Sequence, residues 1–376
     1  MRIGIEVQNM FSPRKHGMDI MMLEVLKELQ EKSSIHDFYL YAQPNKDKAP
    51  ITITENMHLQ IAGPAAYHTW EQLLLPKAVN DDNISLLHCT SNTAPIDLKI
   101  PLVVTIHDLI YLDKCMSRQG TWNQRFGHLY RRWNVPRIAK KAKVVITVSE
   151  YERQRIIEYL KIAPEKVKTI YNACSKHFTP ERNEVEIAVF KTKYKLPDRY
   201  ILFLGNTGPK KNLPNVMRAM NIIHKRKRLD FKLVMPDISK DRLRTLLQAQ
   251  GFEYLLNHIQ LTGYVPNYEM PNLYRLAELF LYPSLSESSG IPILESMACG
   301  TPVITGNTSA MPEVAGNDAL LIDPTKPEAI ADMIETVLTN MQLRIQTIDY
   351  GIKRAALFSS KKMASEIVEV YESIIN

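Results

Sequence analysis

The sequence has few cysteines and no long hydrophobic run, and both absences restrict the class of protein it encodes. Its four cysteines, at positions 89, 115, 174 and 299, form no C-x-x-C pair, so we predict free thiols in a reducing compartment. No apolar stretch approaches the ~20 residues that span a bilayer. The first seven residues carry Glu6 within a strand-like pattern and do not resemble a signal peptide. We therefore expect a cytoplasmic protein.

Motifs for binding metals and nucleic acids are also missing. The chain contains no Asp-x-Asp pair and no spacing typical of zinc ligands. It has no aromatic strand of the RNA-binding type and no long basic helix. We expect neither a bound metal nor a nucleic-acid partner.

Positive charge is present but unevenly placed. Residues 1–180 contain 24 Lys and Arg against 18 Asp and Glu, whereas residues 181–376 contain 23 against 22. Within the first half, residues 114–143 contain nine basic residues and no acidic one. Such a cationic segment favours a peripheral contact with an anionic membrane, which would be the inner face of the plasma membrane.

The middle of this basic segment is predicted to be a helix with an apolar stripe. A stripe of this kind in an α/β domain is commonly core, and that interpretation stays open beside the membrane one. The stripe consists of Trp122, Phe126, Leu129, Tyr130 and Trp133.

Short β-branched runs alternate with helical patterns along the whole chain, which is typical of parallel sheets covered by helices. We predict an α/β fold of two facing Rossmann-like domains, with a cleft at the carboxyl ends of their strands. The expected divisions are a first domain at 1–180, a second domain at 181–358, and a final helix at 359–376 that crosses back to the first domain. Predicted strands are residues 2–7, 38–42, 84–89, 102–106, 144–148, 167–171, 200–205, 231–236, 258–262, 279–282, 302–305 and 319–322, and predicted helices include 17–32, 213–227, 327–340, 343–357 and 360–375.

Residues 282–316 contain the clearest functional pattern. A strand ending at Tyr282 runs into a serine-rich loop, and a helix is predicted to open at Gly290, with proline in its first turn. Gly300 suits the end of that helix. The N–H groups around Ser289–Ile291 would then point out of a helix N-terminus, where a phosphate binds readily. Glu295 would lie one turn into the helix.

This stretch closely resembles the donor motif of retaining glycosyltransferase family 4, whose fold is GT-B. The resemblance rests on Glu287, seven intervening residues and Glu295, followed by the sequence S-M-A-C-G-T-P-V-I and then S-A-M-P-E-V at 309–314. The chain departs from the family at Ser288 and Ser289, where a glycine and an aromatic residue are usual. This change alters the wall near the sugar.

Other segments resemble the family in the expected order. The loop 205–212 resembles its pyrophosphate-binding turn, with Lys211 as the first choice for the phosphates, Lys210 as the second, and Asn206 beside them. His107 matches a histidine beside the donor sugar, and Gly17 lies in a loop against the donor phosphates. Tyr264 and Val265 match the region whose backbone contacts the base. For Asp108, Ser149 and Asn172 we expect only loop, capping and turn roles.

The resemblance implies an enzyme that transfers a hexosyl group, of the mannose or glucose type, from a UDP-sugar or GDP-sugar to a hydroxyl of a glycan or lipid-linked acceptor. It implies retention of configuration and no cofactor. Glu287, His107 and Lys211 are the expected catalytic residues; the expected donor-binding residues are Gly17, Asn206, Lys210, Lys211, Tyr264, Val265, Ser289, Gly290, Ile291 and Glu295. An inactive binding subunit of a transferase complex and a GT-B sugar-nucleotide epimerase are the alternatives.

Overall fold

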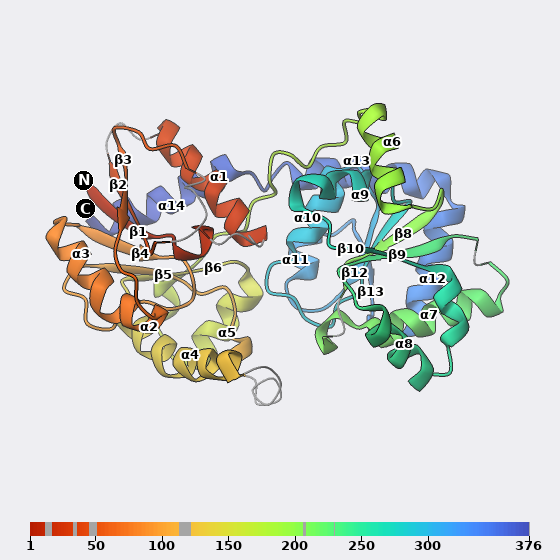
Figure 1. Ribbon diagram of the computed structural model, residues 1–376, viewed down its shortest axis with the longest axis horizontal. Coiled ribbons are helices and arrows are strands. Elements are labelled where there is room, and N and C mark those ends of the chain that lie inside the picture. Colours follow the sequence, from red (N-terminus) through yellow and green to blue (C-terminus); the bar gives the residue numbers. More distant parts are fainter. Residues whose placement is uncertain are drawn as a thin grey trace. The chain divides into compact units, whose positions relative to one another are not determined.

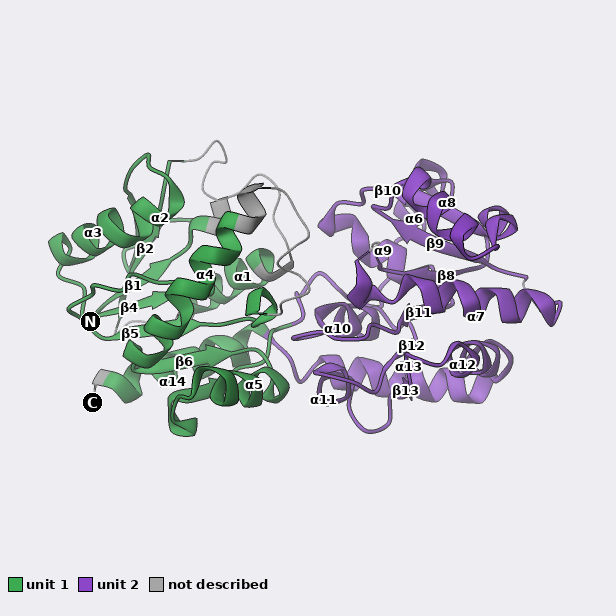
Figure 2. Cartoon of the chain, turned by 90° about the horizontal axis from the view of Figure 1, so that it is seen from below, with its two compact units in different colours: residues 1–173, 360–376 green, residues 174–359 purple. Residues whose placement is uncertain are grey.

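The computed structural model describes residues 1–11, 17–32, 36–44, 51–112, 122–205, 208–228 and 230–375. The chain forms two compact units: unit 1 contains residues 1–173 and 360–376, and unit 2 contains residues 174–359 (Figure 2). Unit 2 begins before the expected boundary at 180. The Cys174 N–H donates to the Phe358 carbonyl at 2.8 Å, and Phe178 belongs to the core of this unit.

Unit 1 is built on a seven-stranded sheet in the order β3-β2-β1-β4-β5-β6-β7, and every recorded pairing between these strands is parallel. Its strands are β1 (Arg2–Glu6), β2 (Asp37–Ala42), β3 (Met57–Ile61), β4 (Leu86–Cys89), β5 (Leu102–Thr105), β6 (Val144–Thr147) and β7 (Val167–Thr169). Its helices are α1 (Gly17–Lys32), α2 (Tyr67–Thr69), α3 (Leu75–Asp81), α4 (Trp122–Lys141), α5 (Glu150–Leu160) and α14 (Ser360–Ile375), as Figure 1 shows.

Unit 2 is built on a six-stranded parallel sheet in the order β10-β9-β8-β11-β12-β13. Its strands are β8 (Tyr200–Phe203), β9 (Lys232–Pro236), β10 (Ile259–Gly263), β11 (Leu279–Tyr282), β12 (Val303–Gly306) and β13 (Leu320–Ile322). Its helices are α6 (Glu184–Tyr194), α7 (Leu213–Lys225), α8 (Lys240–Ala249), α9 (Met270–Arg275), α10 (Ile291–Ala298), α11 (Met311–Ala315), α12 (Pro327–Thr339) and α13 (Met341–Ala355) (Figure 1).

Both faces of each sheet are covered, which explains why the central strands read as apolar runs. Successive side chains of a strand point to opposite faces. In β9, Val234 joins one hydrophobic cluster while Leu233 and Met235 join the other. In unit 1, Val103 and Val104 divide in the same way. The doubly wound α/β architecture predicted from the sequence is confirmed for each unit.

The late helix α14 is part of the core of unit 1 and packs beside α1. Its buried side chains include Met363, Ile367 and Tyr371. The Tyr371 hydroxyl is hydrogen-bonded to Nδ1 of His88 at 2.6 Å, and Nε2 of His88 is 2.8 Å from the Thr105 hydroxyl. Burial lowers the pKa of His88 to about 3, so the imidazole stays neutral. A neutral ring therefore joins this helix to β4 and β5.

One strand was not predicted. Residues 57–61 form β3, the outermost strand beside β2, and most of its side chains are only partly buried. Its sequence, M-H-L-Q-I, lacks the continuous apolar run by which the inner strands were recognised. An edge strand can carry polar side chains because one side of it faces solvent.

Candidate functional site

The loops with the family-like motifs of unit 2 follow strands that all run in one direction. The carboxyl ends of parallel strands meet at one edge of a sheet. Lys210 and Lys211 follow β8, Tyr264 follows β10, and Glu287 follows β11. The fold therefore gathers these residues at one edge of the unit 2 sheet. Asn206 lies outside the described residues.

Helix α10 begins and ends where its sequence predicts. Gly290 is its N-cap, with φ of 64° and ψ of 32°, in the left-handed region that favours glycine. A Cβ at this position would lie 3.0 Å from the Cδ1 atom of Ile293. At the other end Cys299 is the C-cap, and Gly300 follows with φ of 71°. The first N–H groups of the helix, near Ser289 and Ile291, have no acceptor inside the helix, as at any N-terminus.

An ion pair between buried Glu287 and partly buried Lys211 lies beside this helix. The Lys211 Nζ donates to Oε1 of Glu287 at 2.7 Å and to the Tyr282 hydroxyl at 2.9 Å. The same ammonium is 4.7 Å from the centre of the Tyr282 ring. Lys210 lies farther out, with Nζ 3.9 Å from Oε2 of Glu287. Burial lowers the pKa of Lys211, while Glu287 opposes that shift.

Asparagine side chains and loop contacts hold the basic turn in place. Asn212, which has a positive φ of 61°, is buried, and its amide donates to the Pro283 carbonyl at 2.9 Å and the Pro324 carbonyl at 2.6 Å. The Leu285 N–H donates to the Lys210 carbonyl at 2.8 Å. These contacts tie the turn after β8 to the loop after β11, so Lys211 and Glu287 are positioned by the same set of bonds.

Glu295, the second glutamate of the motif, is buried and hydrogen-bonded to a tyrosine hydroxyl. Oε2 of Glu295 accepts a hydrogen bond from the Tyr274 hydroxyl at 2.8 Å. Burial raises the pKa of Glu295 to about 7, and the tyrosine hydrogen bond only partly opposes this. A carboxyl with a pKa so close to neutrality, beside a helix N-terminus, has the character of a binding or catalytic group.

The remaining predicted residues of unit 2 differ in accessibility. Tyr264 is 62% exposed, whereas the Val265 side chain is buried in the hydrophobic core, so Val265 offers a ligand its backbone alone. Ser289 and Ile291 are partly exposed. Tyr274 and Tyr282 were not singled out from the sequence. An aromatic residue ending a buried strand or lying in a short helix is indistinguishable from core until its hydroxyl partner is known.

His107 belongs to unit 1, at the end of β5. Its backbone N–H donates to Oδ1 of Asn92 at 2.6 Å, and Nε2 contacts the Thr90 carbonyl at 2.8 Å. Since a carbonyl only accepts, Nε2 carries the proton. Burial lowers the pKa of His107, so the ring is neutral. Asp108 accepts from the Ile110 N–H at 3.1 Å, which confirms its predicted loop role.

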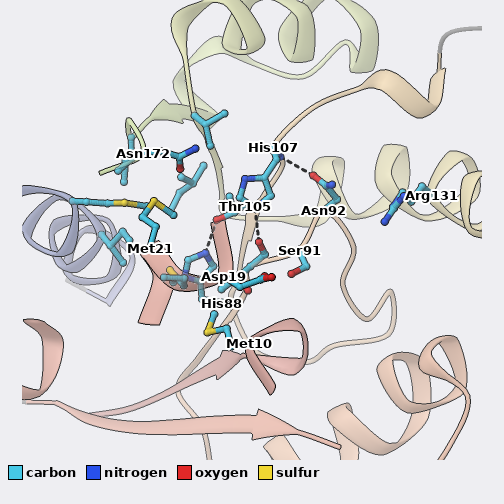
Figure 3. A pocket seen from close by; sticks show the side chains of 17 residues that line it. Met10, Asp19, Met21, His88, Ser91, Asn92, Thr105, His107, Arg131 and Asn172 are labelled. Atoms are coloured by element: carbon cyan, nitrogen blue, oxygen red, sulfur yellow. Dashed lines mark hydrogen bonds between the residues drawn. The ribbon is translucent and has the colours of Figure 1, made fainter. Parts of the chain in front are cut away.

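A pocket of about 150 Å³ opens beside His107 within unit 1 (Figure 3). Thr90, Asn92 and Asn172 line it together with His107. The capping role predicted for Ser149 is confirmed, because its hydroxyl accepts from the Glu152 N–H at 3.2 Å. The turn role predicted for Asn172 is wrong, because the backbone forms no turn at this residue. Its amide is buried, and within the described part of the chain neither amide atom has a hydrogen-bond partner. Gly17 begins α1, but the loop before it lies outside the described residues.

Metal-binding and membrane-spanning features were sought over the described ranges. No group of three or more His, Cys, Asp or Glu residues there is arranged to hold a metal ion. No helix in those ranges combines the length and apolar character needed to cross a membrane.

Two family models match the chain in succession. The model described as Glycosyltransferase Family 4 matches residues 16–178, and the model described as Glycosyl transferases group 1 matches residues 184–354. The boundary between them falls close to the boundary between the two units.

Similar proteins include two mannosyltransferases of Escherichia coli. The O-antigen chain mannosyltransferase B is 31% identical over 235 residues, which are 61% of this chain and 61% of that protein. The serotype-specific mannosyltransferase WbdA is 27% identical over 278 residues, which are 73% of this chain and 33% of that protein. The chain therefore spans less than two thirds of the length of these curated relatives.

Among solved structures, the Anabaena protein HepE in complex with UDP and glucose has a TM-score of 0.72 at 17% identity, covering 99% of this chain and 100% of that one. At this identity the likeness concerns the fold. The two family models and the mannosyltransferase relatives show that the chain belongs to the glycosyltransferases of family 4 type, which have the GT-B fold.

Proposed function

We propose that this protein transfers a hexosyl group, of the mannose or glucose type, from a nucleoside-diphosphate sugar to a hydroxyl of a glycan or lipid-linked acceptor. The observation that carries the proposal is the Lys211–Glu287 ion pair beside the N-terminus of α10, with Glu295 one turn into that helix. Cations and helix N-termini attract phosphate, and carboxylates bind hydroxyls. The mannosyltransferase relatives favour mannose, and the HepE complexes favour UDP.

In the proposed complex each group has one task. Lys211, Lys210, Gly17 and the N–H groups at 289–291 bind the diphosphate of a UDP-sugar or GDP-sugar. Glu295 accepts hydrogen bonds from the ribose, and the backbone at 264–265 contacts the base. Glu287 and, in unit 1, His107 contact the transferred sugar. Neither a metal ion nor another cofactor is assigned a role.

We further propose that the reaction retains the anomeric configuration. The acceptor oxygen bonds to the anomeric carbon on the face from which the diphosphate leaves, and the acceptor proton passes to the leaving phosphate. Developing charge on that phosphate is stabilised by Lys211, which is held ready by Glu287 and Tyr282. Stabilisation by a preformed site costs no reorganisation during the reaction.

Two other functions use the same fold. Ser288 and Ser289 replace residues usual in the family, and the alternative of an inactive subunit that binds a nucleotide sugar for a partner transferase rests on this change. A sugar-nucleotide epimerase is the other alternative. All three functions involve nucleotide binding, but they differ in the reaction that the purified chain catalyses.

The first prediction tests the function directly. UDP-, GDP- and ADP-linked glucose and mannose are added to the purified protein, and thermal unfolding is measured. The preferred donor at a hundredfold its Kd should stabilise the protein by about 2.7 kcal/mol. The same donor should be hydrolysed slowly, with release of free sugar. Stabilisation without turnover would identify a binding subunit, and an epimerised donor would identify an epimerase.

The second prediction concerns Glu295. Glu295→Gln should weaken nucleoside diphosphate binding by about 1.5–3 kcal/mol, because it removes charge-assisted hydrogen bonds. Since the pKa of Glu295 is raised to about 7, wild-type affinity should also fall as the pH drops from 8 to 6. The ligand's own phosphate ionises in the same range, but it does so for both proteins. A calorimetric pH series in which wild type and variant run parallel would contradict the assignment.

Folding of the Gln variant can be checked independently. A raised carboxyl pKa means that the folded state holds its proton more tightly than the unfolded state, so stability is lost as pH rises from about 4.5 to about 7. Glu295→Gln removes this loss and should unfold at the same or a higher temperature than wild type at pH 8. Weaker nucleotide binding is then not a consequence of poor folding.

The third prediction concerns Lys211. Lys211→Ala should lower kcat more than it raises KM, because the charge it stabilises grows as the diphosphate leaves. Lys211→Arg should keep part of kcat, and Lys353→Ala, on the exposed surface of α13, is the matched control. Steady-state kinetics measure both constants. If Lys211→Ala changes KM alone, the lysine serves only ground-state binding.

The outer face of α4 supports a further proposal, a peripheral contact with an anionic membrane. Three members of the stripe are exposed and therefore not core: Phe126 at 62%, Leu129 at 61% and Trp133 at 45%. Tyr130 is partly buried, and its hydroxyl is hydrogen-bonded to Gln72 at 2.7 Å. The core face of the helix is formed instead by Val135, Ile138, Ala139 and by Ala142 just beyond its end. Arg137 lies over the Trp133 ring at 5.2 Å. Aromatic side chains flanked by cations are typical of helices that lie in membrane surfaces. Residues 113–121 lie outside the described part of the segment.

The fourth prediction is that the protein sediments with phosphatidylserine vesicles at low salt and is released at high salt, at about 1 kcal/mol per basic residue near the surface. A Phe126→Ser, Leu129→Ser, Trp133→Ser variant should lose this binding. Val185→Ser with Val189→Ser, which changes two exposed apolar side chains of α6, should keep it. Equal binding to neutral vesicles, or none to anionic ones at low salt, would refute the proposed contact.

A further inference from the structure

The Asn172 amide is buried beside the unit 1 pocket with its hydrogen-bonding capacity unused. Its side chain is 3% exposed, and over the described ranges neither Oδ1 nor Nδ2 has a partner. Burying an amide without hydrogen bonds is costly, and such groups in folded proteins call for an explanation. By contrast Asn134, also fully buried in unit 1, accepts from the Ala94 N–H at 3.2 Å and donates to the Ala94 carbonyl at 2.8 Å.

His107 offers the same pocket a second unpaired polar atom. Its Nε2–H is used by the Thr90 carbonyl, so Nδ1 carries a lone pair. This Nδ1 is buried and has no partner in the described part of the chain. Both side chains appear as lining groups in Figure 3. The pocket thus presents two acceptors and two N–H donors from two side chains.

The rest of the lining limits what those groups can bind. Asp19 and Arg131 contribute one charge of each sign, which does not favour a strongly charged ligand. At about 150 Å³ the pocket has room for several waters, which is the scale of one monosaccharide ring. A large part of the remaining wall is apolar, and it is formed by Met10, Met21, Met22, Ile146, Met363 and Ile367.

We propose that this pocket binds one neutral sugar ring, and that Asn172 determines which ring it accepts. The C–H face of the ring lies on the methionine wall, and adjacent hydroxyls bond to the Asn172 amide and to Nδ1 of His107. Methionine adapts to an irregular apolar surface, and the amide distinguishes hydroxyl arrangements because it both donates and accepts. This inference rests on the proposed glycosyl transfer and adds a specificity residue to it. The ring belongs either to the acceptor or to the donor.

The test compares Asn172→Leu and Asn172→Ala with the wild type. Leucine has the branched shape of asparagine, is somewhat larger and cannot form hydrogen bonds, whereas alanine leaves the space open. Methyl glycosides of mannose, glucose and N-acetylglucosamine are titrated by ligand-observed NMR, and KM is measured separately for donor and acceptor. We expect both variants to lose glycoside binding and to raise one KM at least tenfold. A raised acceptor KM places the acceptor ring in the pocket, and a raised donor KM places the donor sugar there.

Stability separates this role from a structural one. Removing an unpaired amide should leave the melting temperature of Asn172→Leu unchanged or higher, while Asn134→Leu should lower it because it breaks two buried bonds. The inference fails if both Asn172 variants keep wild-type KM values and glycoside binding. It also fails if only the leucine variant changes them, because the amide then forms no hydrogen bond that selects the sugar. Wild-type donor hydrolysis and nucleotide binding are measured in parallel. Their absence would refute the proposed function instead.

Discussion

The organisation of this protein follows from one constraint: each sheet is parallel and buried on both faces. Backbone groups are paired within the sheet, and the side chains on both faces meet hydrophobic clusters. Functional polar groups are therefore concentrated where strands end and loops begin. His107 follows β5 and Glu287 follows β11, so each lies just beyond the carboxyl end of an inner strand of its own sheet. The same type of parallel sheet therefore carries a histidine at its carboxyl edge in unit 1 and a glutamate in unit 2.

Within unit 2 a few hydrogen bonds and one ion pair hold the loops at the carboxyl edge of the sheet in place. Glu287 is buried, and its partner Lys211 has lost most of its hydration. Removing either partner would leave the other charge without its counter-ion in a largely buried place, which is strongly destabilising, so each partner holds the other at the site. The Asn212 amide donates hydrogen bonds to the Pro283 and Pro324 carbonyls and so links the turn after β8 to the loops after β11 and β13. The pair is therefore held in place by side chains and loop carbonyls of unit 2 itself.

The sequence predicted the parts of this structure that depend on local pattern. The inner strands, the start of α10 at Gly290, the cap at Ser149 and the loop role of Asp108 all follow from residue types at fixed offsets. Features that depend on partners distant in sequence could not be predicted. The pKa of Glu295 depends on its burial and on Tyr274. The exposure of Phe126 depends on which face of α4 meets the sheet. The amide of Asn172 is unpaired because, in the described part of the chain, no hydrogen-bonding group comes within reach of it.

The return of α14 to unit 1 has a consequence for how the chain is made. During synthesis the strands of unit 1 emerge first, yet the wall that Met363, Ile367 and Tyr371 provide emerges only after all of unit 2. Until then, apolar surface along α1 and the polar ring of His88 lack their cover. Unit 2, which is continuous in sequence, has no such delay. The nascent chain therefore carries an incompletely packed unit 1 while unit 2 can already fold.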